Sequence, residues 1–417
     1  MSRAGTRYYG WRIVGVAFLT HCITTGIVFY SFGVFLNSLT GHFGWSRAEV
    51  SFGFSLVSLC GAAYSPFVGR VVDRFGSRPS QLVGAVAMAT GFWLLSRIDS
   101  LVHFYLLMGL VVSLGSTALG ALPSNAAVAR WFVRRRGRAL GISTAGISMG
   151  GVIFVPLTQF LIDRSGWRDA FALLAVIIVV VALPPVALFM RRSPEAMGLS
   201  PDGDTAEPEA VGVDLVREME RSWTAAQAIR HRNFWLIGAA FALTVTGLSA
   251  TLLHQIPFLR DRGFTAAEAS WVLGATAGVG VLGKLGFGAL LERFGQRHVT
   301  LWCFGLQALG LLLLMATTNW MVLALYVLVY GFAMGGNATL QATVVGECFG
   351  RLHYGSIAGR MTPLVVLIQA VSIPLAGAVR DQQGTYVPAF AGVVLANLVA
   401  MVCIARLERG ARPPSVR

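Results

Sequence analysis

The stretch Gly69-Arg-Val-Val-Asp73-Arg-Phe-Gly-Ser-Arg78 recurs later in the chain as Gly288-Ala-Leu-Leu-Glu292-Arg-Phe-Gly-Gln-Arg297. Both copies place a glycine four residues before a carboxylate and the run Arg-Phe-Gly-x-Arg directly after it. A glycine lets two helices approach closely, and a carboxylate is stabilised at the N-terminus of a neighbouring helix. Each copy follows the second apolar stretch in a set of six. The repeat therefore predicts two similar halves, each with six membrane spans.

The composition is that of an integral membrane protein. Hydrophobic residues make up 55% of the 417 residues and charged residues 12%, and the mean hydropathy is +0.67. A soluble globule of this size needs more polar surface. Stretches of about 20 apolar residues can cross ~30 Å of hydrocarbon as helices, whereas barrel strands need only about 9–11 alternating residues. We predict an all-α integral membrane protein with twelve transmembrane helices at residues 12–37, 47–68, 79–97, 101–124, 138–162, 168–190, 233–259, 267–291, 299–318, 320–344, 356–378 and 386–405.

The distribution of arginine predicts the orientation of these spans. Most arginines lie near the termini or in the loops that follow the even-numbered spans. The positive-inside rule therefore places both termini in the cytoplasm. The first span shows no cleavage site, so we expect a multi-pass protein of the cell inner membrane. The net charge of +14 is dispersed among loops, which favours anionic membrane lipids over nucleic acid as its partner.

One long polar stretch, residues 191–232, divides an N-terminal half (residues 1–190) from a C-terminal half (residues 233–417). It contains the turn signals Ser193-Pro194 and Pro201-Asp202-Gly203, and we expect a cytoplasmic tether. Residues 212–230 within it have the spacing of a short amphipathic surface helix. The cysteines show no disulfide or metal spacing, and the loops hold no nucleophile–base set. We expect no cofactor, no metal and no enzymatic activity, in a protein that works as a monomer.

The doubled loop resembles the signature of the major facilitator superfamily. The resemblance implies a fold of two six-helix halves and a latch that holds them together on the cytoplasmic side while the cavity opens outward. The arginines of the motif are expected to pair with its carboxylate at the inner surface. Arg360, just inside span eleven, is a further candidate for a cytoplasmic gate. The predicted gating residues are Gly69, Asp73, Arg74, Gly76, Arg78, Gly288, Glu292, Arg293, Arg297 and Arg360.

A second motif follows span four and reads Trp131-Phe-Val-Arg-Arg-Arg-Gly-Arg-Ala-Leu-Gly141. It resembles the aromatic, basic and small-residue signature of the monocarboxylate transporter family and its bacterial relatives, which include oxalate/formate exchangers. Its arginines suit the phosphates of lipids. The motif continues as a small-residue face that we expect to pack against a helix of the other half, made of Gly141, Ala145, Gly146 and Gly150.

Lys284 is the only lysine in the chain, and it lies inside the apolar run of residues 270–291. An ammonium in hydrocarbon costs about 2.5–3.5 kcal/mol on insertion scales, and intramembrane charges usually face a bundle interior or a water-filled path. The resemblance implies a role for it, because family members place a cation in span eight to bind the substrate carboxylate. Eukaryotic members carry a proton-transferring aspartate one turn earlier, where this chain has Gly280. Coupling through that carboxylate is excluded, which leaves Lys284 itself or a histidine.

Other candidates for contact with the substrate are polar side chains within the spans. His254 lies near the outer end of span seven, and histidine is the side chain that titrates near neutral pH. Tyr330 and Asn337 are seven residues apart and so lie on roughly one face of span ten. Tyr30 matches a cavity-facing position of the resembled family. Asn125 lies near a break that we expect Pro123 to make in span four.

These features predict a secondary active transporter of small organic anions, most of all monocarboxylates, that works by alternating access. Lys284 is the expected carboxylate ligand, a proton is a candidate co-substrate, and both symport and antiport stay open. One fixed cation suits a monoanion better than a dianion. A dicarboxylate/monocarboxylate exchanger, with Arg360 as its second cation, is one alternative. Another is a non-transporting membrane receptor or accessory protein on a carrier fold, because a fold does not determine a function.

Overall fold

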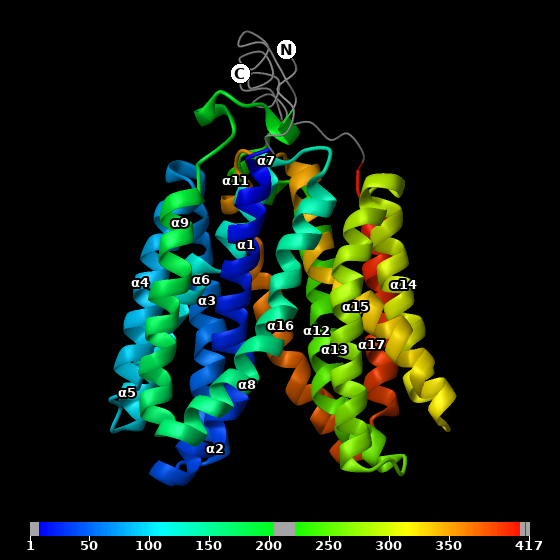
Figure 1. Ribbon diagram of the computed structural model, residues 1–417. Helices are drawn as coiled ribbons and strands as arrows, with labels where there is room; N and C mark the ends of the chain where they lie inside the picture. The colour runs from blue at the N-terminus through cyan, green and yellow to red at the C-terminus, as the bar shows by residue number, and fades with distance from the viewer. Residues whose placement is uncertain (1–7, 204–221, 409–412, 414–417) are drawn as a thin grey trace. The chain divides into compact units, whose positions relative to one another are not determined.

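The computed structural model describes residues 8–203, 222–408 and 413, and these residues are mostly helical (Figure 1). Within these ranges no β-strand is present, and the predicted all-helical architecture is confirmed. Nine segments of the described chain are long and apolar enough to cross a membrane, judged by length and composition. One of them, Arg136–Phe189, is 54 residues long and contains two predicted spans. The remaining two predicted spans coincide with helices α4 (Ser77–Leu95) and α16 (Tyr354–Gln383).

The N-terminal half begins with a span that changes its helix type midway. α1 (Gly10–Thr24) continues as the π-helix η1 (Thr25–Tyr30) and then as α2 (Phe32–Phe43). α1 packs along α8 (Arg136–Ile177), which turns at Gly166, where φ is +82° and ψ is +166°. α8 therefore contributes to two spans. The other elements of this half are α3 (Arg47–Phe75), α4, α5 (Leu101–Leu106), η2 (Leu107–Val112), α6 (Ser113–Leu119), α7 (Ala121–Trp131), η3 (Ile178–Ala182) and α9 (Leu183–Phe189).

Span four is broken at Gly120 and not at Pro123. α6 ends just before Gly120 and α7 starts just after it, and the glycine has φ −81° and ψ −135°. Pro123 lies in the first turn of α7, where its missing N–H removes no helical hydrogen bond. A Cβ atom at Gly120 would lie 3.0 Å from Cγ2 of Thr24, so the break also suits a close contact with α1. The expectation of a proline break was therefore wrong.

The C-terminal half repeats the helix ends of the N-terminal half. α3 starts from a capping box formed by Ser46 and Glu49, and α13 (Ala266–Phe294) starts from one formed by Thr265 and Glu268. A capping box satisfies two N–H groups that a helix start leaves without partners. The internal repeat thus includes both ends of these helices: the capping box at the start of each helix and the Arg-Phe-Gly-x-Arg loop at its end. The other elements of this half are α11 (Ala225–Arg230), α12 (Arg232–Asp261), α14 (Gln296–Met315), α15 (Trp320–Phe349), α16 and α17 (Val387–Ala405).

The described chain forms two compact units. The first contains the described residues up to Trp223 together with Phe349–Thr362, and the second contains Thr224–Cys348 and the described residues from Pro363 onward. The start of α16 therefore belongs to the first unit. The limits predicted for the two halves and the linker stay a prediction. Residues 204–221 of that linker, with most of the surface helix expected there, lie outside the described residues.

Candidate functional site

Lys284 lies where α13 and α15 approach each other closely. Glycines on both helices remove the side chains that would separate them. A Cβ atom at Gly335 would collide with the carbonyl oxygen of Gly280 and lie 3.0 Å from the backbone nitrogen of Lys284. A Cβ atom at Gly283 would collide with the carbonyl oxygen of Phe332. This contact fixes the backbone from which the Lys284 side chain leaves α13.

The Lys284 side chain is buried within the second unit, with 6% of its surface exposed. Gly280, one turn earlier on α13, contributes no charge, and its neighbours on α15 are the Gly331 carbonyl and Met334. The desolvation that makes a buried ammonium costly also strengthens its attraction for an anion. The position therefore has the chemistry of a site for a carboxylate.

Tyr330 and His254 lie in the same unit as Lys284. Tyr330 is 1% exposed and stacks on Tyr326, with ring centroids 5.4 Å apart. A Cβ atom at Gly310 would lie 2.6 Å from the Cβ of Tyr330, so the base of this side chain lies against α14, while its hydroxyl interacts with Thr251 of α12. The His254 ring packs on Tyr386, with centroids 5.1 Å apart. Neither residue is on the helix contact that holds Lys284.

Asn337 and Gln255 are among the amides of the second unit that keep unused hydrogen-bonding capacity. Asn337 is 4% exposed, and neither of its amide atoms has a hydrogen-bond partner among the described residues. The Tyr326 hydroxyl donates to Oε1 of Gln255 at 2.8 Å, while Nε2 of Gln255 has no partner in the described chain. An unsatisfied buried polar group costs about 1–3 kcal/mol. Asn337 was a sequence candidate; Gln255 was missed, because nothing in its spacing distinguishes it.

In the first unit, the predicted residues Tyr30 and Asn125 lie on different elements. Tyr30 ends the π-helix η1 and is 43% exposed. π-Helical turns occur frequently at functional sites. Oδ1 of Asn125 lies 3.2 Å from Nε2 of His21, so α7 is joined to the last turn of α1. The hydroxyls of Thr20 and Ser124 form a second hydrogen bond between the same two helices, at 2.8 Å, which the sequence did not indicate.

The small-residue face of α8 packs against α1 of the same half. A Cβ atom at Gly146 would collide with the carbonyl oxygen of Phe18, and one at Gly150 would collide with that of Cys22. The expected packing of this face against the other half was therefore wrong for these glycines. Their spacing indicates a close helix contact but not which helix supplies it.

Asp73 binds the start of α16. Its Oδ1 accepts a hydrogen bond from the N–H of Gly355 at 2.9 Å, and its Oδ2 accepts one from the N–H of Ser356 at 2.6 Å. These amides belong to the first turn of α16 and have no partner within the helix. A Cβ atom at Gly69 would collide with the carbonyl oxygen of Gly355, so the glycine permits this approach. The contact of the carboxylate with a helix N-terminus is the one that the motif predicted.

The cation beside Asp73 is Arg130 and not an arginine of its own motif. Arg130 and Asp73 line the same small crevice, and the positive charge of Arg130 acts on the carboxylate. The guanidinium of Arg74 lies instead 5.2 Å from the ring centroid of Phe75, and Arg78 is exposed. The expectation that the arginines of the motif pair with the carboxylate was therefore wrong. Arg130 comes from α7, which the local motif does not include.

The second copy of the loop has the same backbone but different contacts. Gly295 has φ +74°, close to the +88° of Gly76. Glu292 is exposed, whereas Asp73 holds two helix amides. The other predicted gating residues of the C-terminal half are a buried Gly288, Arg293 with its guanidinium 5.4 Å from the Phe294 ring, Arg297 donating to the Ala405 carbonyl, and a half-buried Arg360 in α16.

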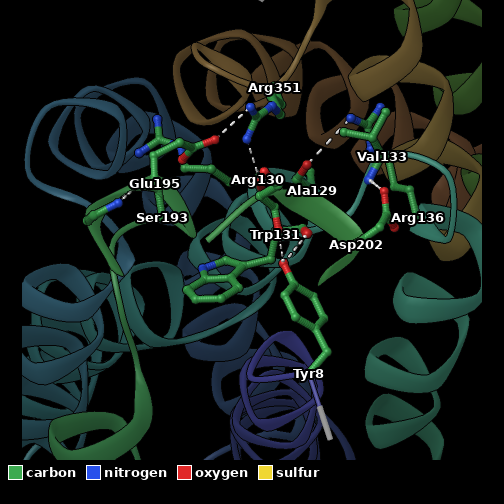
Figure 2. Close-up of polar contacts among 12 residues, drawn as sticks. Tyr8, Ala129, Arg130, Trp131, Val133, Arg136, Ser193, Glu195, Asp202 and Arg351 are labelled. Carbon is green, nitrogen blue, oxygen red and sulfur yellow. Dashed lines mark hydrogen bonds and ion pairs between the residues drawn. The ribbon is translucent and has the colours of Figure 1, made fainter. Parts of the chain in front are cut away.

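A buried ion pair ties the linker to the segment before α16, as Figure 2 shows. Oε1 of Glu195 lies 2.7 Å from Nη2 of Arg351, and these side chains are 15% and 3% exposed. Arg351 also donates to the carbonyl oxygen of Arg130 at 2.8 Å, and Arg130 donates to that of Leu352 at 2.7 Å. Sequence reasoning missed this network, because Glu195 follows Ser193-Pro194 and reads as an ordinary turn residue.

Gly335→Ala is expected to destabilise the protein, because the new methyl group forces α13 and α15 apart at Lys284. Overpacking of this kind costs about 1–3 kcal/mol. Thermal unfolding of the purified protein in detergent measures the effect. Gly274→Ala on α13 is the matched control, since a Cβ atom there meets nothing within 4 Å. Equal melting temperatures for the two variants would show that the close approach is not required.

The sequence of the chain is similar to those of known transporters. The family model described as Major Facilitator Superfamily matches residues 17–259 and 235–417. Monocarboxylate transporter 13 of Bos taurus is 27% identical over 92% of this chain and 85% of its own length. Monocarboxylate transporter 12 of Rattus norvegicus is 24% identical, with 92% and 82% covered. The resemblances read from the two motifs are thereby confirmed.

Solved structures share the architecture. The proton:xylose symporter XylE superposes with a TM-score of 0.74 at 14% identity and 94% coverage of both chains. The Escherichia coli fucose:proton symporter FucP superposes with a TM-score of 0.69 at 17% identity, covering 94% of this chain and 98% of its own. At these identities the likeness shows the fold alone. It confirms the prediction of twelve transmembrane helices in two six-helix halves.

Proposed function

The chain belongs to the Major Facilitator Superfamily, and we propose that this relative of the monocarboxylate transporters carries small organic anions, most of all monocarboxylates, by alternating access. The observation that carries the proposal is Lys284. The only lysine of the chain lies inside an apolar helix with 6% of its side chain exposed, at a glycine contact between two spans. A cation in such surroundings binds an anion more strongly than it would in water.

A single ammonium favours one carboxylate over two. A carboxylate can accept charge-assisted hydrogen bonds from Lys284, whereas the second charge of a dianion would need another desolvated cation. The relatives named above as monocarboxylate transporters support the same substrate class. Arg360, the candidate for a second cation, lies on the part of α16 that groups with the first unit.

The arginine distribution supports an orientation with both termini in the cytoplasm of a cell whose inner membrane holds the carrier. The exposed side chains of Arg134 and Arg135 on the loop after α7 suit contact with anionic headgroups in this orientation. In the proposed orientation the Asp73 contact would lie at the cytoplasmic surface, where a gate between the two halves would act.

Uptake into proteoliposomes tests the proposal. Purified protein is reconstituted and offered a panel of labelled monocarboxylates, dicarboxylates and neutral analogues of the same size. We expect saturable uptake of monocarboxylates and no uptake of neutral analogues. Preferred uptake of dicarboxylates against an internal monocarboxylate would indicate the exchanger instead. Binding without any uptake or counterflow would indicate a receptor on a carrier fold.

The same assay resolves the coupling. Because Gly280 occupies the place of the aspartate, we expect uptake either to ignore an imposed pH gradient or to depend on a group other than a carboxylate there. His254→Gln keeps hydrogen bonding and removes titration near neutral pH. If uptake is proton-driven, this variant should lose the dependence on the gradient. A variant that remains fully proton-driven would exclude His254 and leave Lys284 as the titrating group.

A further inference from the structure

Asp202 is the only residue besides glycine with a positive φ in the described chain. Its φ is +61° and its ψ is 0°, and the next residue, Gly203, has φ +81°. L-residues avoid this left-handed region unless contacts elsewhere compensate for the strain, and Asp and Asn tolerate it best. Asp202 is also buried, at 7% exposed. The sequence predicts only a tether for this stretch, so the burial and the left-handed backbone of Asp202 call for a structural explanation.

Three consecutive backbone amides bind the Asp202 carboxylate. Oδ2 accepts from the N–H groups of Val133 and Arg134 at 3.0 and 2.8 Å, and Oδ1 accepts from that of Arg135 at 3.0 Å. These amides directly precede α8, so the linker supplies an acidic cap to the start of that helix. Figure 2 shows Asp202 against this loop. The carboxylate binds the amides of Arg134 and Arg135, and the side chains of these two residues are exposed.

Tyr8 holds the same piece of linker from another side. Its hydroxyl lies 3.0 Å from the carbonyl oxygen of Trp131 and 3.2 Å from that of Ser200, and its one hydrogen is shared between these two acceptors. Burial raises the pKa of the Tyr8 phenol, so the group stays a donor at any physiological pH. A Cβ atom at Gly203 would lie 2.8 Å from Cδ2 of Tyr8, so the ring packs directly on the linker backbone. We call Tyr8, Ser200, Asp202 and Gly203, together with residues 133–135, the linker clasp.

The linker clasp fixes the chain a few residues after Glu195, whose carboxylate meets Arg351 at 2.7 Å. Arg351 in turn precedes the first turn of α16, which binds Asp73. We propose that Asp202 is a positioning residue that holds the linker on the loop before α8 and thereby presents Glu195 to Arg351, so that the linker takes part in closing the cytoplasmic side. This role goes beyond substrate transport and can be tested without a substrate.

Hydrogen exchange followed by mass spectrometry on the purified full chain tests the proposal. Asp202→Asn removes the charge, and asparagine accepts the left-handed backbone. We expect amides of residues 133–135 and of residues 351–356 to exchange at least about tenfold faster, because charged acceptors are lost and local opening becomes easier. Glu195→Gln should accelerate residues 351–356 alone. Asp99→Asn, at an exposed carboxylate paired only with His103 among its described contacts, is the neutral control.

Faster exchange in residues 133–135 with wild-type exchange in residues 351–356 would overturn the proposal, since Asp202 would then be a local cap only. A pair of glycine variants keeps the test decisive if Asp202→Asn folds poorly. Gly203→Ala displaces the Tyr8 ring, whereas Gly198→Ala has a similar positive φ of +67° and no atom within 4 Å. Gly203→Ala should reproduce the faster exchange of both segments, and Gly198→Ala should not. Equal effects of the two alanines would also overturn the proposal.

Discussion

Asp73→Asn is expected to shift the carrier from its cytoplasm-closed state toward its cytoplasm-open state, with little loss of expression. The carboxylate holds two first-turn amides of α16, at 2.9 and 2.6 Å, and an asparagine would offer one of them an NH2 group in place of an oxygen. A hydrogen bond to a charged group contributes about 1.5–3 kcal/mol, so the ratio of the two states should change at least about tenfold. The mutation leaves Lys284, the proposed ligand of the substrate, untouched.

Labelling of single cysteines introduced into the cavity, from either side of the membrane, measures this ratio. Glu292→Gln is the matched control, because the second copy of the loop exposes its carboxylate where Asp73 binds a helix. It should change the ratio far less than Asp73→Asn does. Unchanged labelling and unchanged transport kinetics in Asp73→Asn would remove any gating role from this contact.

The spans could be predicted because their signals are local. Length and apolar composition are read within about 30 residues, and the chain folds each span as a helix whatever lies beside it. The capping boxes at Ser46 and Thr265 show how far such signals extend: each uses a residue pair three positions apart. The break in span four was misplaced because proline is a weak signal in the first turn of a helix, whereas the glycine break depends on packing against α1.

For contacts between elements, the sequence predicts the kind of contact but not the residues on the other side of it. The glycine and the carboxylate of the quoted loop indicated a helix N-terminus, and the structure provides one at Gly355 and Ser356. They did not indicate Arg130, which comes from another helix. The same limit explains why the small-residue face of α8 was assigned to the wrong partner. Residue spacing indicates which face of a helix has small side chains, but it does not indicate which helix packs against that face.

The linker differs most from what the sequence predicts. Pro201-Asp202-Gly203 was read as a turn, and it is one, but the aspartate also reaches the amides of residues 133–135. Turn residues are common in exposed loops, so the sequence alone offered no reason to bury this one. The partners of this carboxylate are backbone amides, which every residue except proline has. No oppositely charged side chain in the sequence therefore indicates the contact.

Lys284→Ala is expected to insert into the membrane at least as well as the wild type and to lose carboxylate binding. The substitution removes a buried ammonium, whose insertion is costly, and with it the cation that we propose as the ligand of the substrate carboxylate. Losing one partner of a desolvated charge pair costs about 2–5 kcal/mol, which weakens binding more than about tenfold. Lys284→Arg keeps the charge but replaces a compact donor with a planar fork, so we expect partial binding with an altered preference among carboxylates.

Arg360→Ala is the control for a general effect of removing a cation. It should leave monocarboxylate affinity close to that of the wild type, because the proposal assigns the carboxylate to Lys284 alone. If Lys284 had a purely structural role, Lys284→Ala would reduce expression. The variant protein that does fold would then keep its affinity for the substrate.

The most direct test compares the binding of a labelled monocarboxylate with that of its neutral amide, in purified wild type and purified Lys284→Ala. We expect the wild type to bind the carboxylate and to discriminate against the amide, and Lys284→Ala to lose both the affinity and the discrimination. Wild-type affinity for the carboxylate in purified, folded Lys284→Ala would contradict this expectation.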